Sequence, residues 1–436
     1  MAETTASVVE AGTAPDQAED TADAQPALRR NFFGGIWHGA FLALGMSLTQ
    51  PTTVIAAFVA DLTGSTAWVG GLSTVLTAAG VLPQLFVARY IEPRPRKMPY
   101  LMLAIYLRVA SWGVLAWLVH SIGASNPTLT AWALIVLLAA FYAGGGLGGV
   151  PYNDIIGKVI PRGRRGAFFG SRQILAGPLS VGAALLAKQI LGDVSYPDNY
   201  AMLFGLAAIS LAIASLGFWI IKEPPRTDAP GRPESWRHYA AHLIDAGRQL
   251  KTLVAVQLLT GFSLMALPFY VVYARDSLNA PVESTGWFLL IQVIGGVIAN
   301  LIWARLIDRY GSRTMLTTCA TISTLTPLLA VMLGPLGWQA MLPVFFFAGA
   351  SFGGRQVGFS SALLALAPDT ERPTYTALNA ALTLPIAFLP LIAGLLLQSL
   401  SYTTIFIIVA GFIAVGVLWT RRLPAALQVN CHEQRH

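Results

Sequence analysis

Two arginines lie inside long apolar stretches of the sequence, where charged side chains are rare. Arg108 falls within residues 98–120, and Arg355 follows two glycines and precedes Gln356 in a later stretch. A guanidinium group binds a carboxylate or a phosphate through two parallel hydrogen bonds. Because ionisable groups inside apolar helices are costly and usually functional, we expect Arg355, Gln356 and Arg108 to contact an anionic solute. For each arginine the alternative is a structural role.

One acidic residue and one histidine also lie inside apolar stretches. Asp154 follows a glycine-rich segment, and Arg172, a few residues into the next stretch, is its expected ionic partner. The pair is either a static bridge or a contact that changes with conformation or protonation. His38 lies in the first turns of the first stretch and is either a packing residue or a proton relay.

The sequence has no arrangement typical of an enzyme. No cluster of His, Cys, Asp and Glu has metal-ligand spacing, and no nucleophile–base pair is recognisable. A phosphate-binding loop follows a strand, but no strand pattern precedes the glycine-rich segment 144–149. The small residues of this segment are instead typical of closely packed helices. We therefore expect no enzymatic activity, no metal and no cofactor.

The apolar stretches that carry these residues define the class of protein. Hydrophobic residues make up 55% of the 436-residue chain and charged residues only 11%. About twelve stretches of ~20 residues have the length of a helix that crosses the hydrocarbon core of a bilayer. The sequence predicts an all-α polytopic membrane protein with twelve transmembrane helices, over residues 33–60, 67–90, 98–120, 128–157, 167–191, 200–222, 251–275, 284–306, 314–333, 338–366, 374–399 and 402–420.

The basic residues are distributed unevenly between the two sides that these helices define. The net charge is +7, and most of the 28 Lys and Arg fall in the tails and in the loops on one side. Such a bias places that side, and with it both termini, in the cytoplasm. The charge therefore indicates contact with anionic headgroups of the lipid bilayer and not with nucleic acid. The short loops and the Ala- and Arg-rich composition predict the inner membrane of a bacterium.

Polar breaks divide the chain into two six-helix bundles with flanking segments. The longest break is rich in Pro and Arg, and its residues 234–250 could form an amphipathic helix on the membrane surface. We expect five segments in this order: a disordered cytoplasmic tail (residues 1–31), a first six-helix bundle (32–222), a cytoplasmic linker (223–250), a second six-helix bundle (251–421) and a cytoplasmic C-terminal tail (422–436).

The two halves repeat each other. In each half a proline ends the fourth stretch, an arginine stands in the next loop, and a second proline lies inside the fifth stretch. The spacing is the same in both halves, which favours internal duplication. The residues are Pro161, Arg165 and Pro178 in the first half and Pro368, Arg372 and Pro385 in the second.

A second repeated feature follows the second stretch of each half. Residues 304–313 resemble the cytoplasmic motif of the major facilitator superfamily, G-x-L-a-D-R-x-G-R-K/R, with its functional positions at Asp308, Arg309, Gly311 and Arg313. The first-half copy is degraded and has Glu92 in place of the aspartate. Such a carboxylate can pair with an arginine and face a helix N-terminus. We expect both copies to take part in gating, with a solvated turn as the alternative.

This resemblance covers the membrane region and implies a secondary transporter. Members of the family have two six-helix bundles, bind substrate near the midplane between them, and rock to alternate access. In that fold the first, fourth, seventh and tenth spans line the cavity. Uncharged candidates on those spans, for which helix packing is the alternative, are Gln50, Tyr142, Tyr270 and Tyr273.

The sequence is compatible with three functions. The first is transport of a small organic solute, anionic because of the two central arginines, by proton symport or by exchange, with the protein as a monomer. The second is proton-coupled efflux of a drug or lipophilic cation. Gly177 and Pro178 support this second function, but the absence of a basic residue in the fourth span before Asp154 weakens it. The third is a non-transporting assembly factor or receptor.

Overall fold

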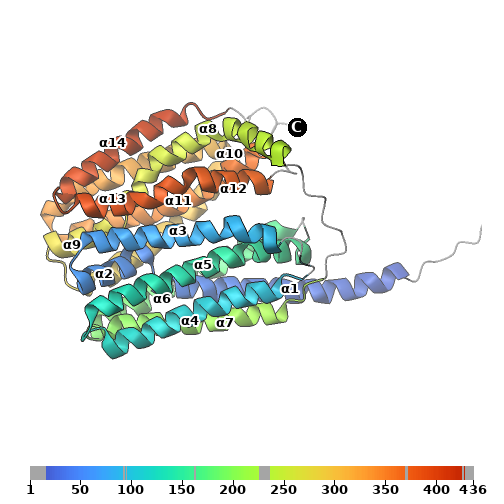
Figure 1. Cartoon of the computed structure of the whole chain (residues 1–436), viewed down its shortest axis with the longest axis horizontal. Coiled ribbons are helices and arrows are strands. Elements are labelled where there is room, and N and C mark those ends of the chain that lie inside the picture. Colours follow the sequence, from blue (N-terminus) through green and yellow to red (C-terminus); the bar gives the residue numbers. More distant parts are fainter. Residues whose placement is uncertain are drawn as a thin grey trace, which may run out of the picture.

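Long α-helices form almost all of the described chain. The computed structural model describes residues 16–91, 94, 96–161, 164–224, 236–368, 372–424 and 427, and this part of the chain contains no strand. The helices lie roughly along one direction in two groups, with most of the first half below the second half in Figure 1.

The first half contributes seven α-helices and a short π-helix within the described residues. Local signals mark some of the boundaries: the Asn126 side chain accepts a hydrogen bond from the Leu129 amide at 3.1 Å and so caps α5, whose first residue is Pro127. The elements are α1 (Asp16–Leu48), η1 (Pro51–Ile55), α2 (Ala56–Thr63), α3 (Thr66–Ile91), α4 (Met98–Ile122), α5 (Pro127–Val159), α6 (Arg165–Asp193) and α7 (Asp198–Ile220).

The second half contributes seven further α-helices and three short 3₁₀ turns within the described residues. Ser401 caps the last helix by accepting a hydrogen bond from the Thr404 amide at 3.2 Å. The elements are α8 (Trp236–Ala266), α9 (Phe269–Ser277), α10 (Ser284–Leu333), η3 (Gly334–Leu336), η4 (Trp338–Met341), α11 (Leu342–Leu366), α12 (Arg372–Thr383), η5 (Leu384–Phe388), α13 (Leu389–Leu396) and α14 (Tyr402–Thr420).

The lengths of these helices suit a membrane protein. In the described chain, ten helical segments are long and apolar enough to cross a membrane. One of them spans 53 residues, from Ser284 to Leu336, and contains Gly311, whose φ of 80° and ψ of 169° break the helix into two. The helix α11, with 25 residues, is not among the ten. The expected all-α membrane fold is confirmed, and the expected twelve spans are compatible with these helices.

Prolines interrupt three of the spans. Pro51 begins the π-helix between α1 and α2, Pro268 caps α9 directly after α8, and Pro385 lies in the 3₁₀ turn between α12 and α13. Each proline lacks the amide hydrogen that a continuous helix would use. The first, seventh and eleventh spans are therefore built from two helical pieces each.

Two helix pairs form the main seam between the halves. Helix α3 packs on α13, and α6 packs on α10, while α1, α4, α5 and α7 pack among themselves. Glycines allow the close approach at the seam: a Cβ atom at Gly70 would lie 2.1 Å from the Pro390 carbonyl oxygen, and one at Gly286 would lie 2.4 Å from the Lys188 Cα.

Two segments differ from the sequence-based expectation. Helix α1 begins at Asp16, so residues 16–31 of the expected tail are helical; their Ala, Glu and Gln content favours a helix, and acidic residues near its start complement the helix dipole. The expected amphipathic helix over 234–250 is helical from Trp236, but it continues without a break into the seventh span as α8.

Candidate functional site

The two ends of the helix bundles differ in charge and packing. We call the end at Lys97 and Arg165 the basic end, and the end at Asp61 and Arg275 the opposite end. At the opposite end one buried apolar cluster combines first-half residues such as Phe58 with second-half residues such as Phe288. Towards the basic end each half has its own cluster. Among the described residues, the cluster that the two halves share therefore lies at the opposite end.

An ion pair joins the halves at the opposite end. The two terminal guanidinium nitrogens of Arg275, on α9, contact the carboxylate of Asp61, on α2: Nη2 at 2.7 Å and Nη1 at 3.0 Å. Tyr200 donates a third hydrogen bond to Asp61, at 3.2 Å. Side chains of Asp61 and Arg275 are only 18% and 15% exposed. A two-pronged pair with so little solvent contact is stronger than an exposed bridge.

Further polar contacts link the halves near this closed end. Gln292 donates to the Thr52 hydroxyl at 2.8 Å, and Thr66 donates to the Gly394 carbonyl oxygen at 2.8 Å. The Lys188 ammonium group lies 3.5 Å from the centre of the Trp287 ring. These contacts hold the two halves together at the opposite end.

The first bundle encloses a small cavity of about 160 Å³ between α1, α4, α5 and α6. We call it the first-bundle cavity; its polar lining consists of His38, Arg108, Tyr152 and Arg172. The Arg172 guanidinium donates to the Tyr152 hydroxyl at 2.5 Å. His38 is buried, its Nδ1 lies 3.2 Å from the Ala214 carbonyl oxygen, and its ring packs on Phe218.

Arg108 has weaker partners than the other arginine of this cavity. Its guanidinium carbon lies 4.5 Å from the centre of the Phe141 ring, and its Nη2 contacts the sulfur of Met46 at 3.8 Å. Its Nε is buried and has no hydrogen-bond partner within the described chain. A buried donor without an acceptor is unfavourable, so this site is suited to an incoming anion.

Glycines make the room that these arginines occupy. A Cβ atom at Gly39, on α1, would lie 2.1 Å from the Arg172 Nε, and one at Gly144, on α5, would lie 3.0 Å from the Arg108 Cγ. Gly145 and Gly148 also line the cavity. The glycine-rich segment of the fourth span therefore accommodates a guanidinium group, in addition to allowing close helix packing.

The second bundle has a cavity of about 270 Å³ that contains Arg355. We call it the second-bundle cavity; the polar side chains among its lining residues are Gln257, Arg355, Gln356, Ser360, Thr376, Asn379 and Thr383. Arg355 donates to the Thr260 hydroxyl at 2.6 Å and to the Gln257 carbonyl oxygen at 2.8 Å, and lies 5.0 Å from the centre of the Phe359 ring. Its guanidinium is thus anchored to α8 while it still lines the cavity.

Each of the two cavities is lined by positive charge that no carboxylate in its described lining balances. Three guanidinium groups, those of Arg108, Arg172 and Arg355, line them, and no carboxylate occurs among their lining residues in the described structure. A cation in a low-dielectric interior is costly unless it is paired. Such a lining can bind a carboxylate or a phosphate.

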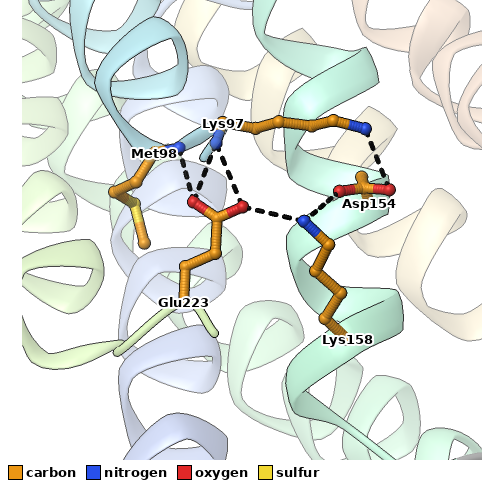
Figure 2. A network of polar contacts seen from close by, with 5 residues as sticks. All are labelled: Lys97, Met98, Asp154, Lys158 and Glu223. Atoms are coloured by element: carbon orange, nitrogen blue, oxygen red, sulfur yellow. Dashed lines mark hydrogen bonds and ion pairs between the residues drawn. The ribbon is translucent and has the colours of Figure 1, made fainter. Parts of the chain in front are cut away.

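The expected pair between Asp154 and Arg172 does not form. Asp154 instead contacts the Lys97 ammonium group at 3.0 Å and the Lys158 ammonium group at 2.8 Å, as Figure 2 shows. Tyr152 faces the cavity, and at about 100° per residue a position two further along the helix points away from it. Asp154 therefore faces Lys158 one turn later, and Arg172 bonds to Tyr152.

Glu223, directly after the first bundle, completes the network around Asp154. Its carboxylate accepts hydrogen bonds from the amides of Lys97 and Met98 at 2.8–3.0 Å and contacts the Lys158 ammonium group at 3.0 Å (Figure 2). It thereby caps the start of α4, where the helix dipole favours a negative charge. This network ties α4, α5 and the end of α7 together, and sequence reasoning did not find Glu223.

The motif residues occupy the bend in α10. Gly311 provides the positive φ at which the chain turns from the eighth to the ninth span. Arg313 donates to the Arg421 carbonyl oxygen, Arg309 lies over its neighbour Tyr310, and Asp308 makes no ion pair with a described residue. The expected gating role of these residues stays a prediction. Glu92, its first-half counterpart, lies outside the described residues.

The four uncharged candidates do not line either cavity. Tyr270 and Tyr273 belong to an aromatic group with Phe406 at the opposite end. Tyr142 packs edge to face on Phe141. Gln50 lies at the start of the π-helix, where its carbonyl oxygen accepts backbone hydrogen bonds. Their expected contact with substrate stays a prediction, whereas Tyr152, Gln257 and Asn379, which the sequence did not single out, do line the cavities.

Comparison with known proteins gives both a family model and curated relatives. Residues 253–435 match the model described as Major Facilitator Superfamily. The chain is 23% identical over 318 residues to the uncharacterized proteins Rv2209 of Mycobacterium tuberculosis and Mb2232 of Mycobacterium bovis, a match that covers 71% of this chain. The chain therefore spans 59% of the length of these relatives.

Solved structures match the chain over nearly its full length. A mutant of the nucleoside transporter NupG has a TM-score of 0.68 at 13% identity, covering 90% of this chain and 99% of that one. The inward open conformation of the xylose transporter XylE from E. coli has a TM-score of 0.64 at 13% identity, covering 94% and 97%. A D-xylose-proton symporter has a TM-score of 0.63 at 15% identity, covering 92% and 98%. At these identities the match shows a shared fold.

Proposed function

We propose that this chain, a protein of the Major Facilitator Superfamily type, is a secondary transporter that moves a small organic anion across the membrane by alternating access. The observation that carries the proposal is the charge of the two bundle cavities: Arg108, Arg172 and Arg355 line them without a carboxylate among the described lining residues. Because a buried cation requires an anionic or strongly polar partner, the solute is expected to carry a carboxylate or a phosphate.

The packing of the two halves supports alternating access. The opposite end is held by the Asp61–Arg275 pair and by a shared apolar cluster, whereas each half has its own cluster towards the basic end. The positive-inside bias supports a cytoplasmic position for the basic end, with a bacterial inner membrane as the proposed location. This conformation then faces inward, and rocking of the bundles would open the opposite end.

Coupling to a proton or to a second anion would supply the energy. His38, beside Arg172 in the first-bundle cavity, is a titratable group that proton coupling could use. A structural neighbour is a D-xylose-proton symporter, which supports symport as one mode. Exchange against another anion uses the same cationic lining. Efflux of a lipophilic cation is the alternative, and the lining charge argues against it.

Ligand-dependent thermal stability of the purified full-length protein tests the proposal. The ligand panel contains monocarboxylates, dicarboxylates, sugar phosphates, neutral sugars, nucleosides and lipophilic cations. Each is applied to the native protein, to Arg172→Gln and to the matched control Arg305→Gln. Arg305 is exposed at the basic end, and its one hydrogen bond within the described chain is to Leu301 of its own helix. Ligands that bind the folded state raise its apparent stability by mass action.

The expected result is stabilisation by one class of anion, reduced at least about tenfold in apparent affinity in Arg172→Gln, as for the loss of a charge-assisted hydrogen bond, and unchanged in Arg305→Gln. Uptake of that anion into proteoliposomes would then be measured. Stabilisation by lipophilic cations alone, equal in all three proteins, would overturn the anion assignment in favour of efflux. Anion binding without flux under any ion gradient would favour a receptor.

A further inference from the structure

A second pair of cavities lies at the basic end of the first bundle, away from the two bundle cavities. The larger, of about 760 Å³, lies between α1, α5, the start of α6 and the segment after α7. We call it the basic crevice; its charged and amide side chains are Arg30, Asn31, Lys158, Arg165, Lys222 and Glu223. A neighbouring cavity of about 330 Å³ is lined by Leu28, Phe32, Phe33 and Ile36, and also by Arg29 and Arg164; we call it the apolar crevice after its four apolar residues.

The ion-pair network of Figure 2 reaches the basic crevice but does not neutralise it. Within the network two lysines, Lys97 and Lys158, face two carboxylates, Asp154 and Glu223, so its formal charges cancel. Three further cations line the crevice: Arg30, Arg165 and Lys222. No described carboxylate forms an ion pair with any of these three.

The three cations are held in ways that leave them available to a ligand. Arg165 donates through Nε to the Ile160 carbonyl oxygen at 3.2 Å and through Nη2 to the Gly157 carbonyl oxygen at 2.7 Å, which fixes its guanidinium at the crevice wall. The Arg30 Nε is buried without a hydrogen-bond partner in the described structure, which is unfavourable unless an acceptor binds there. Lys222 is exposed at the crevice mouth.

The apolar crevice adds a hydrophobic surface directly beside these charges. Leu28 lines both crevices. Phe32 packs edge to face on Phe168, with ring centres 5.3 Å apart, and Phe33 remains 55% exposed. Along α1, cationic side chains are therefore followed by aromatic and aliphatic side chains. A phospholipid has the same order of groups, because its phosphate is followed by its acyl chains.

We propose that the two crevices together bind an anionic phospholipid of the leaflet at the basic end. Arg30, Arg165 and Lys222 contact its phosphate, and its acyl chains lie against Phe32 and Phe33. Guanidinium groups suit the bidentate recognition of phosphate, and basic pockets at the cytoplasmic side of membrane proteins bind anionic headgroups. A zwitterionic lipid carries its own cation and therefore balances less of the positive charge of the crevice.

A lipid at this position would bridge three parts of the first bundle. Arg30 belongs to α1, Arg165 begins α6, and Lys222 follows α7. The ligand would therefore stabilise the arrangement of these helix ends, independently of what the two bundle cavities carry. Lipid binding at the two crevices therefore does not depend on the proposed transport function.

Thermal stability of delipidated, detergent-purified full-length protein tests the lipid site. Phosphatidylglycerol, phosphatidylcholine and inorganic phosphate are titrated separately into the native protein, Arg30→Gln, Lys222→Gln and the control Arg305→Gln. Phosphatidylglycerol is expected to raise Tm more than phosphatidylcholine. Its apparent affinity is expected to fall about fivefold in either crevice variant, as for one basic residue at an anionic lipid surface, and to stay unchanged in the control.

Each other outcome decides against the proposal. Equal stabilisation by phosphatidylglycerol in native protein and in Lys222→Gln would overturn it, and this exposed substitution keeps the test valid if Arg30→Gln does not fold. An equal fall in Arg305→Gln would show diffuse surface charge and no site. A response to inorganic phosphate alone that is lost in the crevice variants would assign the crevice to a soluble phosphate and would overturn the lipid assignment.

Discussion

The three partly buried arginines of the bundle cavities differ in the partners of their guanidinium groups. Arg355 has two oxygen acceptors on α8, and Arg172 has the Tyr152 hydroxyl, whereas Arg108 has a sulfur atom, an aromatic face and an unpartnered Nε. An anion gains most where the cation is least satisfied. At the residue scale we therefore expect the first-bundle cavity to supply the stronger contact with the solute, and Arg355 to combine a structural role with a weaker contact.

Substitution of Arg355 and substitution of Arg108 should change the stability of the ligand-free protein differently. Arg355→Gln removes the two hydrogen bonds that the guanidinium group donates to the Gln257 carbonyl oxygen and the Thr260 hydroxyl, so it should lower the free energy of unfolding by about 1–3 kcal/mol. Arg108→Gln removes a poorly paired charge and should leave Tm without ligand unchanged or higher. Thermal unfolding of both variants without ligand measures this. A lower Tm for Arg108→Gln than for Arg355→Gln would contradict the assignment.

The carboxylate of Glu223 supports a second residue-scale prediction. Its side chain is only 3% exposed and binds two amides at the start of α4 and one ammonium group. Glu223→Gln removes the charge that faces the helix dipole and leaves Lys158 with one carboxylate, so stability should fall by about 1–3 kcal/mol. Differential scanning calorimetry of this variant beside Asp193→Asn, an exposed carboxylate at the end of α6, checks the effect. Equal Tm values for the two variants would refute it.

At the scale of elements, the bend in α10 depends on one backbone conformation. Gly311 adopts a φ of 80° and a ψ of 169°, a region that residues with a Cβ atom avoid. The position matches a glycine of the facilitator motif. The motif therefore sets the turn between the eighth and ninth spans, whatever its charged residues do in gating.

Gly311→Ala should destabilise the protein by about 1–3 kcal/mol, because alanine is strained in this region of φ and ψ. Gly411→Ala is the matched control: Gly411 lies inside α14, and an added Cβ atom there meets nothing within 4 Å. Gly411→Ala should stabilise slightly, since alanine favours a helix over glycine. Tm of both variants in detergent tests the contrast, and an unchanged Tm for Gly311→Ala would show that α10 can bend elsewhere.

At the scale of the whole molecule, closure is concentrated at the opposite end. There the halves share an apolar cluster, two close helix seams and the bidentate pair between Asp61 and Arg275. An alternating mechanism requires these contacts to separate in the other state. Each contact made only in the closed state therefore biases the equilibrium between the two states.

Arg275→Gln should shift that equilibrium towards an open opposite end, by a few-fold for the loss of a partly buried ion pair. Spin labels at Ser125→Cys and Ser399→Cys, with Cys319 and Cys431 replaced by serine, would report the separation of the halves. We expect a larger population at long distances in Arg275→Gln.

The charge-reversed pair Asp61→Arg with Arg275→Asp is the control, because it keeps an ion pair of opposite sense between the same helices. It should recover part of the closed population. A distance distribution that is the same in the native protein and in Arg275→Gln would show that the apolar cluster alone holds the end closed.

The sequence by itself determined the features that depend on local composition. The apolar stretches predicted the membrane helices because helix length and hydropathy are properties of contiguous residues. Pro51, Pro268 and Pro385 lie at breaks in their spans, where the missing amide hydrogen weakens the helix, whereas Pro151 and Pro178 lie inside continuous helices. The resemblance of residues 304–313 to the facilitator motif was visible in the sequence for the same reason, since the motif is contiguous.

Only the tertiary structure decided which side chains meet. Arg108 and Arg172 were separate candidates, and packing of α4 and α6 around α1 and α5 places them in one cavity. Arg172 bonds to Tyr152 and Asp154 to two lysines because the rotation of α5 about its axis sets which face each residue presents. In an almost uniformly apolar helix the sequence pattern does not specify that rotation. It is fixed by the contacts between helices that are distant in the chain.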